Sequence, residues 1–345
     1  MKLYPWIIGT GFLLILSCGN KPQSIWQEPM IAVISEQNDW DQLEPVLEQV
    51  YEKVIRTPQT ETVYVLKHAP DSLFDYYSKQ RYLILTGTLQ SRGPVGDLIQ
   101  RITADPGIRQ SIEQGKNFVF TRRDEWAYDQ TMIILIGSHI ESLKQKIEDH
   151  QAFLYDLMDS EVKQSMQKEV LKNRINKELT DELLDKYQFN MQMQKDYFLA
   201  QDFPDKNFLW MHRRFPDRWI FVRWIDDGDP DLIDKAWVVE ERNRIGKTFY
   251  TDYQEQVVQN PRYLHQENGE FLGRQAIITQ GLWERIDDTA GGPFRNYTFY
   301  DSGTERIYMI DVAVFAPGKE KLPYLRRVDI IAETFRTLFD KPFEL

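Results

Sequence analysis

Cysteine is nearly absent from this sequence. The chain has 345 residues and a single cysteine, Cys18. One cysteine cannot form an internal disulfide, and it cannot supply a Cys-based metal site. A cysteine nucleophile in the folded part of the chain is excluded for the same reason. The fold therefore has to rest on its hydrophobic core alone.

Signatures of common catalytic sites are also scarce. The histidines show no spacing typical of a zinc site, and no Gly-rich phosphate loop occurs beyond the first 20 residues. Ser160-x-x-Lys163 and Ser165-x-x-Lys168 lack the companion motifs of penicillin-recognising enzymes. The aspartate-rich stretch 226–231 lacks the glycine and glutamate of an EF-hand loop. These gaps favour a non-catalytic protein without metal and without cofactor.

Positive charge is in deficit. Lys and Arg number 42 against 53 Asp and Glu, which gives a formal net charge of −11. Such a chain is poorly suited to neutralise phosphates, so we expect no nucleic-acid partner. A hydrophobic fraction of 42% and an aromatic fraction of 13% are typical of a globular protein. The length is enough for about two domains.

The apolar run without charge lies at the start of the chain. Tyr4 to Leu16 is shorter than the roughly 20 residues of a membrane-spanning helix. Together with Lys2 and the small Ser17, it predicts a secretory signal peptide over residues 1–17. The sequence that ends at Cys18 resembles the lipobox of bacterial lipoproteins, whose cysteine carries acyl chains. We therefore predict lipidation of Cys18 and a membrane anchor. The alternatives are an ordinary cleaved signal and an apolar N-terminal helix.

The periodicity of the remaining chain predicts an α+β fold. We expect two mainly antiparallel sheet regions with packed helices, joined by a long helical segment. The helical segment should break near residues 159–160 and 180–181. The predicted parts are a tether over 18–29, an N-terminal α+β region over 30–140, a helical connector over 141–187 and a C-terminal α+β region over 188–345.

The stretch "QGLWERIDDTAGGPFRNYTFYD", residues 280–301, stands out as a candidate binding rim. Tandem glycines permit backbone angles that other residues avoid, and the following proline fixes the next angle. An exposed tryptophan beside such a loop would offer an aromatic plate to a ligand. The alternative is a tight hairpin loop with an aromatic cap. The candidate rim consists of Trp283, Glu284, Asp287, Asp288, Gly291, Gly292, Pro293, Phe294 and Asp301.

Several short motifs resemble those of the domain of unknown function 4837 family, a group of Bacteroidota lipoproteins. The C-terminal ones are Gly281-Leu282-Trp283, Gly291-Gly292-Pro293-Phe294, Asp301, Phe315-Ala316-Pro317 and Arg326-Arg327. The N-terminal ones are Pro58-Gln59 with Glu61, and Trp126-Ala127 with Gln130. The resemblance covers most of the mature chain, although Gln280 stands where the family often has arginine. It implies an envelope lipoprotein and no established activity.

These observations predict a lipid-anchored cell-envelope protein that acts as a non-catalytic binding or scaffold module. Its partners would be the membrane, through the N-terminal lipid, and an envelope protein or a glycan. Residues 19–22 lack the acidic residues that often follow the cysteine of surface-exposed lipoproteins in such bacteria. We therefore expect the periplasmic face of the outer membrane. The alternative function is a carboxylate-dependent hydrolase that acts on cell-wall or polysaccharide material.

Overall fold

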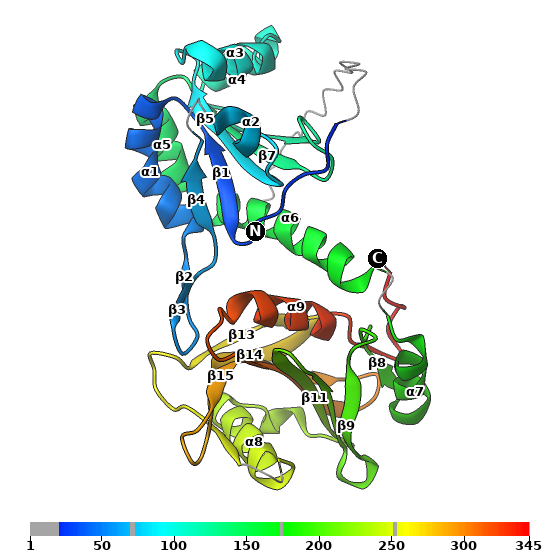
Figure 1. Ribbon diagram of the computed structural model, residues 1–345. Helices are drawn as coiled ribbons and strands as arrows, with labels where there is room; N and C mark the ends of the chain where they lie inside the picture. Colours follow the sequence, from blue (N-terminus) through cyan, green and yellow to red (C-terminus); the bar gives the residue numbers. More distant parts are fainter. Residues whose placement is uncertain (1–20, 70–72, 173–174, 251–253, 345) are drawn as a thin grey trace.

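Two sheet regions make up the part of the chain that the structure describes. The computed structural model describes residues 21–69, 73–172, 175–250 and 254–344. Figure 1 shows the N-terminal region above the C-terminal region, with the helix α6 (Gln151–Leu171) between them. The predicted signal peptide and Cys18 lie outside the described residues. In the described ranges, no helix is both long enough and apolar enough to cross a bilayer.

The N-terminal sheet is mostly parallel, so the prediction of a mainly antiparallel sheet is wrong for this region. Its strand order is β4-β1-β5-β7-β6, and β6 runs antiparallel to β7 while the other pairs are parallel. Every residue of β5 and β7 is buried. Continuous apolar strands of this kind are typical of parallel sheets that are covered on both faces. The strands are β1 (Met30–Ile34), β4 (Val65–His68), β5 (Tyr82–Thr88), β6 (Val119–Arg123) and β7 (Thr131–Gly137).

Helices cover both faces of this parallel sheet. Ile84 of β5 shares a core with Leu43 and Leu143, which come from α1 and α5. Its neighbour Leu83 points to the opposite face and shares a second core with Leu98 of α3. The helices are α1 (Gln37–Tyr51), α2 (Phe74–Tyr77), α3 (Gly93–Ile102), α4 (Pro106–Glu113) and α5 (Ile140–Asp149).

The helices of the connector end at other residues than predicted. The expected break at residues 159–160 lies inside α6, and the one at 180–181 lies inside α7 (Lys177–Tyr187). α5 gives way to α6 at His150, and Asn176 caps α7 by accepting a hydrogen bond from the backbone N–H of Leu179. The carboxylate of Asp159 does not cap a helix, because it binds side chains of other elements.

The C-terminal sheet is antiparallel in the part of the chain described, which confirms the α+β class. Its strand order is β12-β14-β15-β16-β11-β10-β9, and β13 also pairs with β14. The strands are β9 (Phe198–Phe203), β10 (Phe208–Arg213), β11 (Asp217–Ile225), β12 (Glu255–Val257), β13 (His265–Phe271), β14 (Arg274–Arg285), β15 (Gly291–Asp301) and β16 (Arg306–Phe315). A separate pair is β8 (Phe189–Asn190) with β17 (Arg336–Thr337).

One helix lies on each face of this sheet (Figure 1). α8 (Lys235–Thr248) shares a core with Phe221 and Met309. α9 (Leu322–Ala332) shares a core with Ile310 and Val312, whose side chains point to the other face. Residues of the sheet can therefore be assigned to an α8 face or an α9 face by the alternation along each strand.

The N-terminal region contacts the C-terminal region at α9. A hairpin of β2 (Val54–Arg56) and β3 (Thr60–Thr62) carries Glu61 to the start of this helix. The Glu61 carboxylate accepts hydrogen bonds of 2.8 and 2.7 Å from the backbone N–H groups of Lys321 and Leu322. A carboxylate at a helix N-terminus satisfies unpaired donors and complements the helix dipole. The family-like motifs of the two halves thus meet at this helix.

Candidate functional site

The aromatic residues of the candidate rim belong to the core. Trp283 is 2% exposed, and its ring lies 5.1 Å from that of Trp219. Phe294 is buried in the same cluster. The expectation of an exposed aromatic plate is therefore wrong, because α8 and the neighbouring strands cover this end of the sheet.

The tandem glycines Gly291 and Gly292 allow two backbone segments to lie unusually close together. Neither Gly291 nor Gly292 is among the residues with positive φ, since both are extended in β15. A Cβ atom on Gly292 would lie 2.0 Å from the carbonyl oxygen of Val314 and 3.0 Å from Nε1 of Trp283. Pro293 follows as a buried residue of the same strand. The motif therefore allows the indole of Trp283 to pack directly on the strand.

The acids of the candidate rim do not form a facing pair. Glu284 accepts a hydrogen bond of 3.0 Å from Nε2 of Gln256 on the neighbouring strand. Asp287 is exposed in the β14–β15 turn, where hydrogen bonds from Thr289 lower the pKa of its carboxyl. Asp288 has a positive φ of 57° in the same turn. These residues form a polar hairpin tip, as the alternative interpretation expected.

Behind Phe294 lies a buried network of charged and polar side chains that the sequence did not reveal. Nε and Nη2 of Arg242 donate to the carboxylate of Asp311 at 2.9 and 3.2 Å. Asn296 donates to the same carboxylate at 3.0 Å, and Thr298 donates to Asn296 at 2.8 Å. The guanidinium carbon lies 3.9 Å from the centre of the Phe294 ring. We call these residues the Arg242 network.

Glu255 lies beside the Arg242 network and has an unusual acidity. Its side chain is buried on β12, and burial raises the pKa to about 7, although Arg242 acts in the opposite direction. A raised pKa is typical of a catalytic acid in an open cleft. Both Glu255 and Asp311, however, are buried beneath α8. The geometry is that of an interior charge cluster.

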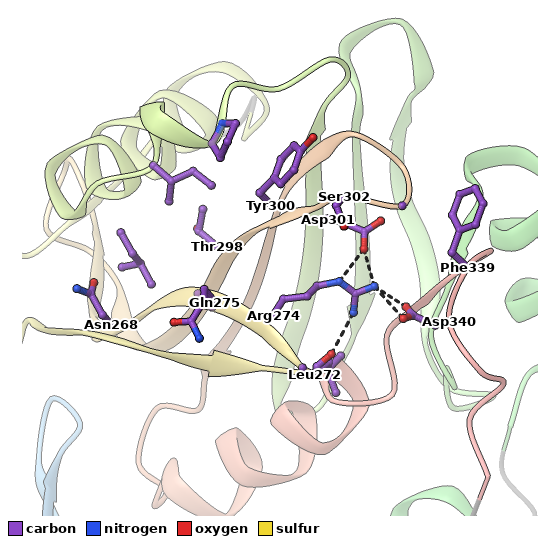
Figure 2. A pocket seen from close by; sticks show the side chains of 16 residues that line it. Asn268, Leu272, Arg274, Gln275, Thr298, Tyr300, Asp301, Ser302, Phe339 and Asp340 are labelled. Atoms are coloured by element: carbon purple, nitrogen blue, oxygen red, sulfur yellow. Dashed lines mark hydrogen bonds and ion pairs between the residues drawn. The ribbon is translucent and has the colours of Figure 1, made fainter. Parts of the chain in front are cut away.

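An open groove lies at the opposite end of β14 and β15. It has a volume of about 790 Å³, and Figure 2 shows its lining side chains. Asp301, the last residue of the candidate rim, lies here at the far end of β15 from Gly291. The structure therefore separates Asp301 from the other rim residues. We call this feature the Arg274 groove.

Arg274 joins three parts of the chain at the end of the groove (Figure 2). Its Nε donates to Asp301 at 2.7 Å, its Nη2 donates to Asp340 at 2.8 Å, and its Nη1 donates to the carbonyl of Leu272 at 3.2 Å. Burial would raise the pKa of the Asp340 carboxyl, but hydrogen bonds from Thr337 and Arg274 hold it below its usual value. The ion pairs therefore fix the C-terminal tail against the sheet.

Four other polar side chains of the groove have no hydrogen bond to any described residue. They come from the β13–β14 hairpin, from the end of β15 and from the turn that follows it. These side chains are Asn268, Gln275, Tyr300 and Ser302. Side chains that are free to bond and that line one groove are typical of a ligand-binding site. The polar alternation Asn296, Thr298, Tyr300 along β15 was the signal in the sequence for this face.

A second cavity, of about 370 Å³, lies in the N-terminal region at the ends of β1 and β4. Ligands of parallel α/β sheets commonly bind at the carboxyl ends of the strands. Here, however, the chain's own acids occupy the crevice between β1 and β5. The Glu36 carboxylate accepts from the backbone N–H of Arg92, and Asp39 accepts from the Ser91 hydroxyl at 2.9 Å. The larger Arg274 groove is therefore the better candidate site.

Metal ligation has no support among the described ranges. No three His, Cys, Asp or Glu side chains there come together in a group that could hold an ion. His212 is half-buried on β10 and lies 3.5 Å from Asp217, with a pKa that burial lowers. It is thus a packed strand residue.

Comparison with known proteins gave one family and some distant structures. No curated protein matches the chain. LpqN of Mycobacterium tuberculosis, described as involved in cell envelope biogenesis, is 12% identical, with 43% of this chain and 81% of that chain covered and a TM-score of 0.27. The Saccharomyces cerevisiae Ran-binding protein Mog1p is 9% identical, with 44% and 90% covered and a TM-score of 0.28. These TM-scores are too low to carry an argument about the chain.

The family match covers the C-terminal region. It extends over residues 176–334 and includes β14, β15 and most of the Arg274 groove. The matching family is described as Domain of unknown function (DUF4837). The motifs around Trp283 and Gly292, which suggested this family in the sequence, lie inside the matched span. Residues 176–334 match the domain of unknown function 4837 family, in agreement with the resemblance of the sequence motifs.

Proposed function

We propose that the protein is a lipid-anchored component of the cell envelope and that it binds a ligand without converting it. The lipobox-like sequence that ends at Cys18 supports the anchor. The prediction of a tether over residues 18–29 is wrong for its second half, because Gln23 and Ile25 form bridges to Tyr128 and Gln80 of the N-terminal region. The periplasmic face of the outer membrane is the proposed location. The binding site would be the Arg274 groove.

The observation that carries the binding role is the state of the polar side chains in the groove. None of the described residues forms a hydrogen bond with the side chain of Asn268, Gln275, Tyr300 or Ser302. These side chains are exposed or partly exposed and are therefore hydrated. A ligand in the groove can replace this water without breaking a hydrogen bond within the protein. Arg274 and its two carboxylates at the same time make the end wall rigid. A preorganised wall beside free polar groups lowers the entropic cost of binding.

The hydrolase alternative has less support from this site. A glycosidase needs two carboxyl groups at a suitable separation, and one of them must act as an acid with a raised pKa. The carboxylates of the groove, Asp301 and Asp340, are both paired with Arg274. The pKa of Asp340 is lowered. The acid with a raised pKa, Glu255, lies in the buried cluster instead.

The anchor can be tested with a Cys18→Ala variant in the native host. We expect the wild type to incorporate labelled palmitate and to sediment with the outer membrane, and we expect the variant to do neither. A Gln114→Ala variant, which changes an exposed side chain of the N-terminal region, is the control. Palmitate incorporation by Cys18→Ala would refute the anchor. Digestion by protease added to intact cells would refute the periplasmic location.

The binding site can be tested by photocrosslinking in native envelopes. A photoreactive residue replaces Ser302 in the groove or, as a control, the exposed Gln114 in the N-terminal region. We expect a discrete adduct at position 302 that is absent at position 114. Identical adducts at both positions, or none at position 302, would refute the groove as the site of binding.

A further inference from the structure

The charges of the Arg274 groove are satisfied within the protein. One carboxylate oxygen of Asp301 bonds to Arg274, and the other accepts from the backbone N–H and the hydroxyl of Thr304. Asp340 is shared in the same way between Arg274 and Thr337. Arg274 and the nearby Arg336 balance the two aspartates, so that no uncompensated charge remains among these four side chains. This arrangement disfavours an anionic ligand and leaves few free carboxylate lone pairs for a cation.

The free polar groups of the groove suit hydroxyl groups. The amides of Asn268 and Gln275 and the hydroxyls of Tyr300 and Ser302 can each donate and accept a hydrogen bond. A sugar hydroxyl also has both capacities, so that each of these side chains can match it in either direction. A ligand that lacks hydroxyl groups would leave part of this capacity unused.

Apolar surface lies among the free polar groups. Ile233 and Leu272 line the groove together with the ring of Tyr300. Phe339 lies at its end beside Gly303 and is 70% exposed. A pyranose ring has a flat face of C–H groups and a rim of hydroxyls. Apolar patches that alternate with amides and hydroxyls complement both parts of such a ring.

The floor of the groove does not suit a peptide that adds as a strand. β14 is paired with β13 on one side and with β15 on the other, and β15 is paired in turn with β16. Backbone groups of these floor strands are therefore used within the sheet. Strand addition requires a free edge. The groove offers side chains rather than backbone to its ligand.

From this combination we infer that the ligand of the Arg274 groove is a neutral oligosaccharide. The inference rests on the proposed binding function and specifies the ligand class of the same site. An open groove of about 790 Å³ can hold a short run of sugar units. Tyr300 would contact a sugar face, and Gln275 would bind its hydroxyls.

The test uses the purified full-length protein in detergent and defined sugar probes. Neutral maltohexaose, laminarihexaose, mannohexaose and chitohexaose are compared by titration calorimetry with anionic oligogalacturonate. We expect at least one neutral probe to bind saturably below about 1 mM and oligogalacturonate to bind more weakly. The double variant Gln275→Ala/Tyr300→Ala should weaken neutral binding by about tenfold or more. The matched variant Gln114→Ala/Tyr128→Ala, on the N-terminal region, should bind like the wild type.

The possible outcomes separate this inference from the proposed function. Absence of neutral binding below about 1 mM, or binding that the groove variant leaves unchanged, would refute the sugar ligand. If the photoreactive residue at Ser302 then captures a protein, the binding function stands and the ligand class is wrong. If it captures nothing, both are wrong. A neutral probe that competes with the adduct at Ser302 would support both.

Discussion

Similar chemistry occurs at the middle of β15 and at its last residue, in different surroundings. Beside Asn296 in the middle of the strand, Arg242 pairs with Asp311 beneath α8, and their side chains are 3% and 0% exposed. At the end of the strand, Arg274 pairs with Asp301 and Asp340, and the three side chains are 13%, 6% and 22% exposed. The first arrangement is closed by a helix, and the second forms the wall of a groove. The residue types alone do not distinguish them.

The difference shows that burial beneath a helix decides the role of an arginine–aspartate pair. Beneath α8 the pair is removed from water, so its charges must satisfy each other and the fold depends on both. In the groove, water still reaches the ion pair of Arg274 and Asp301. This pair holds the end wall of the groove in place. Thr298 lies between the two, because it lines the groove and also donates to Asn296 of the Arg242 network. The same face of one strand therefore changes from core to surface within a few residues.

The largest expected effect comes from breaking the closed pair. Asp311→Ala leaves Arg242 buried without its partner, which should lower the free energy of unfolding by about 3–5 kcal/mol. Asp301→Ala in the groove should cost about 1–2 kcal/mol, because water and Asp340 still compensate Arg274. Urea unfolding measures both. Equal losses of unfolding free energy for Asp311→Ala and Asp301→Ala would contradict this role of burial.

A second test of the buried region beneath α8 uses pH. The pKa of Glu255 is raised from 4.5 to about 7 by burial, so the folded state holds its proton more tightly than the unfolded state. This contribution to stability is complete below pH 4.5 and is lost as the pH rises through about 7. It amounts to about 3 kcal/mol at most.

The Glu255→Gln variant isolates this contribution, because glutamine keeps the shape and does not ionise. The difference in unfolding free energy between wild type and variant should shift by up to about 3 kcal/mol against the wild type between pH 5 and pH 8. Chemical unfolding at several pH values gives that difference. A constant difference over this range would show that Glu255 ionises as it does in the unfolded chain.

Glycines near the two ends of β15 provide a third comparison. Gly292→Ala would bring a Cβ to 2.0 Å from a backbone oxygen of β16, which cannot move freely. We expect it to cost about 1–3 kcal/mol, as overpacking of a core does. Gly303→Ala at the open end would meet the ring of Phe339 at 3.0 Å and its Cβ at 3.1 Å, and a shift of the exposed tail by a few tenths of an ångström would relieve both contacts. Its cost should stay below about 1 kcal/mol in thermal unfolding, and the reverse order would overturn the comparison.

Much of the C-terminal region was predictable because its signals are local. Apolar and polar residues alternate along β14 and β16, and apolar residues recur every three or four positions along α9. The relative direction of the N-terminal strands, in contrast, has no local signal in the sequence. Alternation and apolar content do not record whether a neighbouring strand is parallel. The continuous apolar run of β5 was the available clue, since strands covered on both faces are commonly parallel.

The candidate site was only partly predictable, for two reasons. The sequence drew attention to Trp283 and Gly292, but whether an aromatic residue is exposed depends on α8, which lies about 40 residues earlier in the chain. The groove also needs Asp340, which is 66 residues from its partner Arg274. No local pattern connects these two residues. Asp301, which the sequence grouped with the candidate rim, lies at the other end of β15 from Gly291.

The smallest expected effect concerns a side chain that the groove leaves free. Gln275→Ala should change the free energy of unfolding by less than about 0.5 kcal/mol, because its amide bonds to no described residue. Asn296→Ala, on the same face of the sheet but inside the Arg242 network, should cost about 1–3 kcal/mol, since it leaves hydrogen-bonding groups of Asp311 and Thr298 unpaired. Differential scanning calorimetry of the two variants gives the comparison. A cost above 1 kcal/mol for Gln275→Ala would mean that the fold itself uses this amide. The amide would then not be free for a ligand, and the assignment of the groove as a binding site would lose its main support.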